Sequence, residues 1–227
     1  MSFAFDFALY LWIINLIEMI FVAYIFIREY KKGKMKFYFG VALFYVLFVL
    51  ARLFEVIRVY FTSDGYVPPL TGLNFILKTG YTVFSYIGLT TIYFVLESYV
   101  FTNTKKVFTI LVPIACILSI WFTFYSPLDP MYNLLFTIVL PIYAIILLGI
   151  VGLYIYLAIK SSGEVRRNSI MIIFGILLFE FGILFALPEA QNSVFGAIPL
   201  DILLLLAPIF SIIGVILQIR GFKTSIS

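Results

Sequence analysis

The chain has 227 residues, of which 64% are hydrophobic and 11% are charged, and its formal net charge is +4. Soluble domains are about a quarter charged, so this composition excludes a water-soluble fold and predicts an all-α bundle of membrane helices. The chain has no histidine and one cysteine. This excludes histidine metal sites, clusters held by several thiolates and Ser-His or Cys-His nucleophile pairs. We find no catalytic motif, and we expect a protein that is not an enzyme and holds no metal or cofactor.

Apolar runs that are long enough to cross a bilayer fill nearly the whole chain. Because a span needs about 20 helical residues, the runs predict one domain, residues 1–227, of seven transmembrane helices in the cell membrane. The predicted helices are Phe5–Ile27, Phe37–Phe61, Leu73–Phe101, Val107–Tyr125, Tyr132–Ile159, Ser169–Leu187 and Pro199–Ile219. Asn168 or Ser169 could cap the sixth of them.

Basic residues outside the spans occur only in alternate loops. Twelve of them lie in the first, third and fifth loops and the tail: Arg28, Lys31, Lys32, Lys34, Lys36, Lys105, Lys106, Lys160, Arg166, Arg167, Arg220 and Lys223. Since basic loops stay in the cytoplasm, we predict an outside N-terminus and a cytoplasmic C-terminus. The positive charge then orients helices and attracts anionic membrane lipids, and it does not indicate nucleic acid as a partner.

Five charged residues fall in the outer half of the predicted bundle: Arg52, Glu55, Arg58, Lys78 and Asp201. Charges within a membrane are costly, face the bundle interior and are functional candidates by default. In one interpretation Arg52–Glu55 and Lys78–Asp201 are internal ion pairs, and Arg58 snorkels to the surface. In the other, the five residues line an outward-facing ligand pocket. Its spare positive charge would bind a small anionic ligand, as arginine does with a carboxylate.

Three further acids lie within spans. Glu18 and Glu180 are predicted to lie near the midplane, and Asn15 is one turn from Glu18. These two midplane carboxylates are either neutral groups that form hydrogen bonds across helices or a proton- or cation-linked site. Glu97 lies near the inner end of the third span, where we expect it to pair with Lys105 or Lys106.

Several short strings carry a resemblance to a known family. They are Tyr86-Ile87-Gly88-Leu89, Phe94-Val95-Leu96-Glu97-Ser98-Tyr99, Gly163-Glu164-Val165-Arg166-Arg167 followed by Gly175, and Pro199-Leu200-Asp201. Over its third to seventh helices the chain resembles the seven-transmembrane N-terminal sensor region of archaeal and bacterial histidine kinases. That resemblance implies a receptor-like role. No kinase domain follows the last predicted span, so we expect output through a separate cytoplasmic or membrane signalling partner.

Three functions are therefore open. The first is a sensor-like or receptor-like protein that binds a small ligand or lipid in the outer half of the bundle. The second is a small proton- or cation-coupled secondary transporter that uses Glu18 and Glu180 at the depth where transporter sites usually lie. The third is a structural or assembly subunit of a membrane complex, which would need ion pairs but no ligand pocket.

Overall fold

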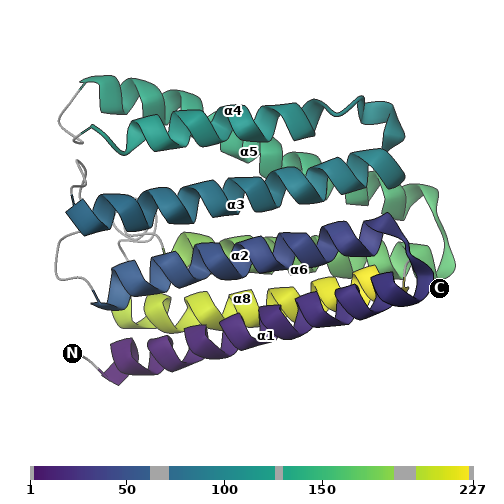
Figure 1. The fold of residues 1–227 in the computed structure, drawn as a ribbon, viewed down its shortest axis with the longest axis horizontal. Helices are drawn as coiled ribbons and strands as arrows, with labels where there is room; N and C mark the ends of the chain where they lie inside the picture. The colour runs from purple at the N-terminus through teal and green to yellow at the C-terminus, as the bar shows by residue number, and fades with distance from the viewer. Residues whose placement is uncertain (1–2, 62–71, 126–129, 187–197, 225–227) are drawn as a thin grey trace. The chain divides into compact units, whose positions relative to one another are not determined.

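The structure is a computed structural model, and it describes residues 3–61, 72–125, 130–186 and 198–224. Within these ranges the chain forms α-helices and one short 3-10 helix, η1, and contains no strand (Figure 1). The elements are α1 (Phe3–Gly33), α2 (Lys36–Phe61), α3 (Gly72–Tyr99), η1 (Thr102–Thr104), α4 (Val107–Phe122), α5 (Pro130–Lys160), α6 (Gly163–Ala186) and α8 (Leu200–Thr224). The predicted all-α class is confirmed.

Six of the described helices are long and apolar enough to cross a membrane, and α4 is shorter. With 16 residues, α4 spans about 24 Å, against about 30 Å of hydrocarbon. It ends before the predicted Tyr125 because the last turn tightens. The N–H of Thr123 donates to the carbonyl of Ile120 at 3.1 Å, and Tyr125 repeats this three-residue spacing with Phe122 at 3.4 Å. Such bonds close a helix end.

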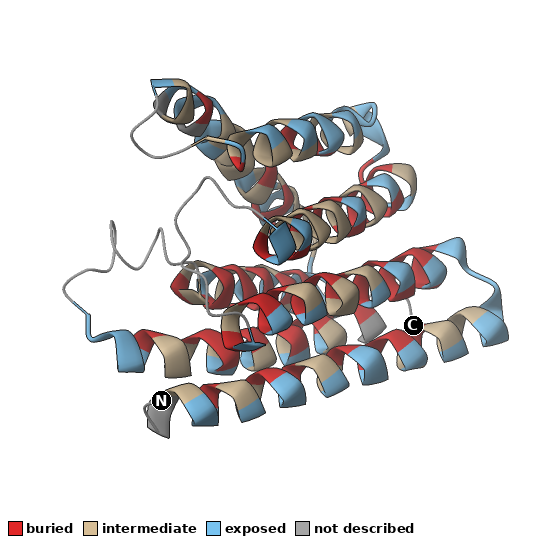
Figure 2. Ribbon diagram, turned by 60° about the vertical axis from the view of Figure 1, so that its left-hand side comes forward, coloured by how far each residue is buried: buried red, intermediate tan, exposed pale blue. Residues whose placement is uncertain are grey.

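Many large apolar side chains are exposed along the described helices, in addition to those buried between them. Pale blue marks the exposed residues along the ribbon in Figure 2. On α1, Ile17 and Phe21 are each 61% exposed, one turn apart. A water-soluble protein rarely exposes contiguous apolar surface of this kind. In a bilayer the same surface faces lipid, and helices satisfy their own backbone groups there. The chain is therefore a multi-pass membrane protein.

Other predicted helix ends also differ from the structure, and the last helix continues beyond Ile219 to Thr224. The first helix continues beyond Ile27 to Gly33, where Lys32 pairs with Glu29 one turn earlier at 2.8 Å. The sixth begins at Gly163, so the prediction that Asn168 or Ser169 caps it is wrong. Both are buried within the helix, and the Ser169 hydroxyl donates to the carbonyl of Val165.

The chain divides into two compact units. The terminal unit consists of Met1–Glu18 and Ile150–Ser227, and the central unit consists of Met19–Gly149. Helices α1 and α5 each contribute one part to either unit.

Close approach of α6 and α8 builds the terminal unit. A Cβ on Gly175 would lie 2.8 Å from the carbonyl oxygen of Gly214, and one on Gly182 would lie 2.6 Å from that of Ala207. Rising numbers on α6 meet falling numbers on α8, so the two helices are antiparallel. Only glycine lets the backbones come this close. The buried side chain of Gln218 also donates to the carbonyl of Gly175 at 3.1 Å.

In the central unit α2 and α3 lie side by side (Figure 1). Side chains of one helix fill the space beside glycines of the other: Val95 at Gly40, Phe54 at Gly80 and Phe48 at Gly88. The numbering again runs in opposite directions, so this pair is antiparallel. Helix α4 packs on α3, where the hydroxyls of Tyr86 and Ser119 form a 2.8 Å hydrogen bond.

Candidate functional site

The charge cluster that we predicted for the outer half of the bundle is built on one side of α2. Arg52, Glu55 and Arg58 are all buried, because residues three apart share a helix face. Arg52 lies 16 positions after Lys36, the first residue of α2, so the cluster begins about 24 Å along that helix. The cluster therefore occupies the half of α2 away from Lys36.

Arg58 holds Glu55 with two hydrogen bonds. Its Nε donates to Glu55 Oε2 at 3.0 Å, and its Nη2 donates to Oε1 at 2.7 Å. Arg58 is 4% exposed, so the prediction that it snorkels to the surface is wrong. It is instead the bidentate partner of the acid. A fork-to-fork contact is the strongest pairing that arginine offers a carboxylate, and it occupies both oxygens of Glu55.

Arg52 and Lys78 converge on Tyr81, a residue that the sequence did not single out. The guanidinium carbon of Arg52 lies 5.9 Å from the centre of the Tyr81 ring, and Lys78 Nζ lies 5.3 Å from it. Both distances are within cation–π range. Arg52 and Lys78 also act on Glu55 through their charges. Lys78 is half-buried on α3, so the structure brings together four of the five predicted residues.

The fifth residue, Asp201, belongs to the terminal unit. It is exposed and lies in the first turn of α8, where an acid complements the positive end of the helix dipole. Its pairing with Lys78 stays a prediction.

Glu18 is the end of a short polar chain in the terminal unit. The amide of Asn15 donates to Glu18 Oε2 at 3.2 Å, and the hydroxyl of Ser211 donates to the Asn15 oxygen at 3.2 Å. The predicted proximity of Asn15 and Glu18 is confirmed. The link across helices runs from α8 to Asn15 rather than to the carboxyl group. Oxygen Oε1 of Glu18 is buried without a hydrogen-bond partner in the described part of the chain.

Glu180, the second midplane carboxylate, is buried on α6. Glu18 forms its hydrogen bond with Asn15 on its own helix, and no hydrogen bond joins the two acids within the described ranges. A site that uses both acids stays a prediction.

Glu97 caps the start of α4. Its carboxylate accepts hydrogen bonds from the backbone N–H groups of Phe108 (3.2 Å) and Thr109 (2.8 Å) and from the Thr109 hydroxyl (2.5 Å). The expected pairing with Lys105 or Lys106 is wrong, because the free N–H groups at a helix start bind a nearby carboxylate directly. The side chain of Lys106 instead lies 4.5 Å from the ring centre of Phe94.

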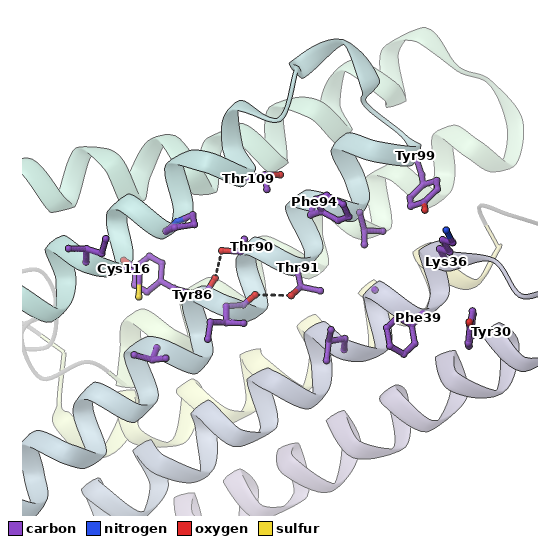
Figure 3. Close-up of a pocket in the computed structure, with 17 residues that line it drawn as sticks. Tyr30, Lys36, Phe39, Tyr86, Thr90, Thr91, Phe94, Tyr99, Thr109 and Cys116 are labelled. Atoms are coloured by element: carbon purple, nitrogen blue, oxygen red, sulfur yellow. Dashed lines mark hydrogen bonds between the residues drawn. The ribbon is translucent and has the colours of Figure 1, made fainter.

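The central unit also contains an open groove that the sequence did not predict (Figure 3). It has a volume of about 830 Å³ and is walled mainly by α2, α3 and α4. Lys36, Tyr30 and Tyr99 lie at one end, and Cys116 lies toward the other. None of the charge-cluster residues lines it. Its polar lining includes threonines and tyrosines that are scattered along the sequence. They form no sequence motif from which the groove could be predicted.

No family model, curated protein or solved structure matches the chain. The resemblance to the sensor region of histidine kinases therefore stays a prediction. The described residues contain no group of three or more Cys, Asp or Glu side chains that could hold a metal ion.

Proposed function

We propose that this protein is a receptor-like membrane protein that binds a small anionic ligand at the cluster of Arg52, Glu55, Arg58 and Lys78. A separate partner would carry the signal onward. Asp201 is proposed as a fifth contact. The ligand class follows from charge, because the described cluster contains three cations and one acid.

The observation that carries this proposal is the bidentate contact between Arg58 and Glu55. It uses both oxygens of the acid, so Glu55 is already engaged when a ligand arrives. Arg52 and Lys78 each lie within cation–π distance of the Tyr81 ring. An aromatic ring beside two cations holds them in place while leaving their N–H groups able to donate to a carboxylate or phosphate.

Thermal unfolding of the purified protein in detergent tests this proposal with succinate and inorganic phosphate as probes, against equal ionic strength of chloride. We expect either or both probe anions to raise Tm, since a ligand that binds the folded state at 100 times its Kd stabilises it by about 2.7 kcal/mol. Lys78→Met should raise about tenfold the anion concentration that is needed for the same shift in Tm. Lys31→Met is the matched control, because Lys31 is exposed on α1.

Two results would contradict the proposal. One is a Tm shift that chloride reproduces, and the other is an equal response in Lys78→Met and Lys31→Met. Tyr81→Phe keeps the ring and should keep the response, whereas Tyr81→Leu should weaken it. A response that ignores the ring would remove Tyr81 from the site.

The polar chain at Glu18 supports a second candidate, a proton-coupled transporter. A carboxyl oxygen buried in a span without a hydrogen-bond partner is suited to gain and lose a proton or to meet a cation. Proteoliposomes that report proton uptake in the presence of candidate solutes test this function. Uptake that Glu18→Gln and Glu180→Gln each abolish would favour the transporter over the receptor. Absence of uptake, or uptake that survives both changes, would reject the role of these acids.

A further inference from the structure

The groove in the central unit has a wall that is apolar even where its residues are polar. Thr90 and Thr91 line it, but their hydroxyls donate to backbone carbonyls one turn earlier, at 2.8 Å to Tyr86 and 2.9 Å to Ile87 (Figure 3). The single hydroxyl hydrogen of each threonine is therefore already used, and it cannot donate to an occupant of the groove. The Thr109 hydroxyl is likewise engaged, by Glu97. The middle of the groove is therefore suited to an apolar ligand.

Exposed hydrophobic side chains complete this wall. Phe39 and Leu43 of α2, Ile87 and Phe94 of α3 and Ile117 of α4 all line the groove and are exposed. The lining of α3 runs from Val83 to Tyr99, about 24 Å along the helix. A volume of about 830 Å³ lies within the usual range of ligand pockets, about 300–1,000 Å³. A long, narrow, open and apolar shape suits a hydrocarbon chain.

The two ends of the groove differ in charge. Lys36, Tyr30 and Tyr99 line the same end (Figure 3). Their side-chain polar atoms form no hydrogen bond within the described ranges. Lys106 lies over the ring of Phe94, which is itself part of the wall. Two cations and two tyrosine hydroxyls therefore surround one end, and Cys116 and Ile117 lie away from it.

We propose that this groove binds one acyl chain of an anionic phospholipid, whose head group lies between Lys36 and Lys106. The apolar wall would hold the chain, and the two ammonium groups would select a phosphate head group that lacks a compensating positive charge. This site is separate from the charge cluster in the other half of α2. A test of lipid binding in the groove therefore does not decide the proposed receptor function, and the reverse also holds.

Photocrosslinking in nanodiscs of phosphatidylcholine tests the inference. The probes are phosphatidylglycerol and phosphatidylcholine that carry the same diazirine-labelled acyl chain, and the labelled peptides are identified by mass spectrometry. We expect phosphatidylglycerol to label the lining residues of α3 and α4 about 25-fold more than phosphatidylcholine does, which is about fivefold for each of the two lysines. A lysine near a membrane surface contributes about 1 kcal/mol toward an anionic lipid, which is about fivefold.

Matched variants separate the head group from the chain. Lys36→Gln should lower the preference for phosphatidylglycerol about fivefold, and adding Lys106→Gln should remove the remainder. Lys31→Gln removes an exposed charge nearby in sequence that does not line the groove, and it should change nothing. Leu43→Trp should fill the groove and lower labelling by both lipids, and its exposed position makes the larger ring tolerable.

Three outcomes would overturn the inference. Equal labelling by the two lipids would reject the head-group selection, and labelling spread over other helices would reject the groove. The third is coverage by a second copy of the chain. Since Cys116 is the single cysteine and lines the groove, a disulfide-linked dimer formed on mild oxidation, with the probe excluded, would show that a protein covers this face.

Discussion

The pairing of Arg58 with Glu55 makes a quantitative prediction for stability. Arg58→Met removes two hydrogen bonds, at 3.0 and 2.7 Å, and each hydrogen bond to a charged group contributes about 1.5–3 kcal/mol. Glu55 stays behind at 5% exposure. Because removal of one member of a buried pair leaves the other uncompensated, we expect the free energy of unfolding to fall by about 3–5 kcal/mol.

A double-mutant cycle isolates the pair from the rest of the cluster. Glu55→Gln alone should cost less than Arg58→Met, since the amide keeps an acceptor oxygen and carries no charge. The double variant should lose less than the sum of the single losses, with a coupling of about 1–3 kcal/mol. A second cycle between Arg52 and Glu55 serves as the comparison. The coupling energy between Arg52 and Glu55 should be smaller than that between Arg58 and Glu55, because Arg58 forms two hydrogen bonds with Glu55 in addition to the attraction between the charges.

Reversible unfolding by sodium dodecyl sulfate in mixed micelles, followed by far-ultraviolet circular dichroism, supplies the four free energies of each cycle. Two results would refute the reasoning. Additive losses at Arg58 and Glu55 would mean that the contact contributes nothing. A larger coupling for Arg52 than for Arg58 would restore the pairing that the sequence first suggested.

Three further predictions concern the capping of α4, the packing of α6 on α8, and the topology. Glu97→Ala should cost about 1–3 kcal/mol and speed amide exchange at the start of α4, because two backbone N–H groups lose their acceptor; unchanged exchange would exclude a capping role. Gly214→Ala should cost about 1–3 kcal/mol, since its Cβ would lie 2.6 Å from a backbone nitrogen of α6. Gly152→Ala, with nothing within 4 Å, should stabilise by about 0.5–1 kcal/mol, and the opposite ranking would contradict the packing of α6 on α8. For topology, single cysteines replacing Ser63, which lies outside the described residues, and Ser162, in a Cys116→Ser background, should react oppositely with an impermeant maleimide on intact cells. Labelling at 162 but not at 63 would reverse the predicted orientation.

Helices and buried charges could be predicted from the sequence because each leaves a local signal. Apolar runs of span length mark a membrane helix wherever it packs, and charges spaced three apart on α2 share one face in any arrangement. The polar neighbour of Glu18 followed from the same spacing. Which arginine forms the bidentate contact with Glu55 did not follow, because Arg52 and Arg58 are both three residues from Glu55 and spacing alone does not distinguish them.

Other features depend on how separate helices approach one another. Glu97 has a basic pair nearby in sequence, yet it binds the N–H groups of α4 because α4 turns back against α3 at that point. Tyr81 belongs to the charge cluster because α3 packs beside α2, which the sequence around Tyr81 does not indicate. The groove needs three helices at once. Thr90 and Thr91 donate their hydroxyl hydrogens to their own helix, and Thr109 donates its hydroxyl hydrogen to Glu97 of α3. None of these arrangements has a periodic pattern that could predict it.

Helices α2 and α3 together carry both proposed sites. The charge cluster lies in one half of α2, and the groove begins at Lys36 at its other end. Between these ends α3 is locked to α2 by side chains packed against glycines, at Gly40, Gly80 and Gly88. Sliding one helix along the other would drive Val95 and two phenylalanine rings against a close-packed backbone, which protein interiors do not accommodate by small adjustments. The α2–α3 pair therefore resists sliding, and it would fix the distance between the two proposed sites, the charge cluster and the Lys36 end of the groove.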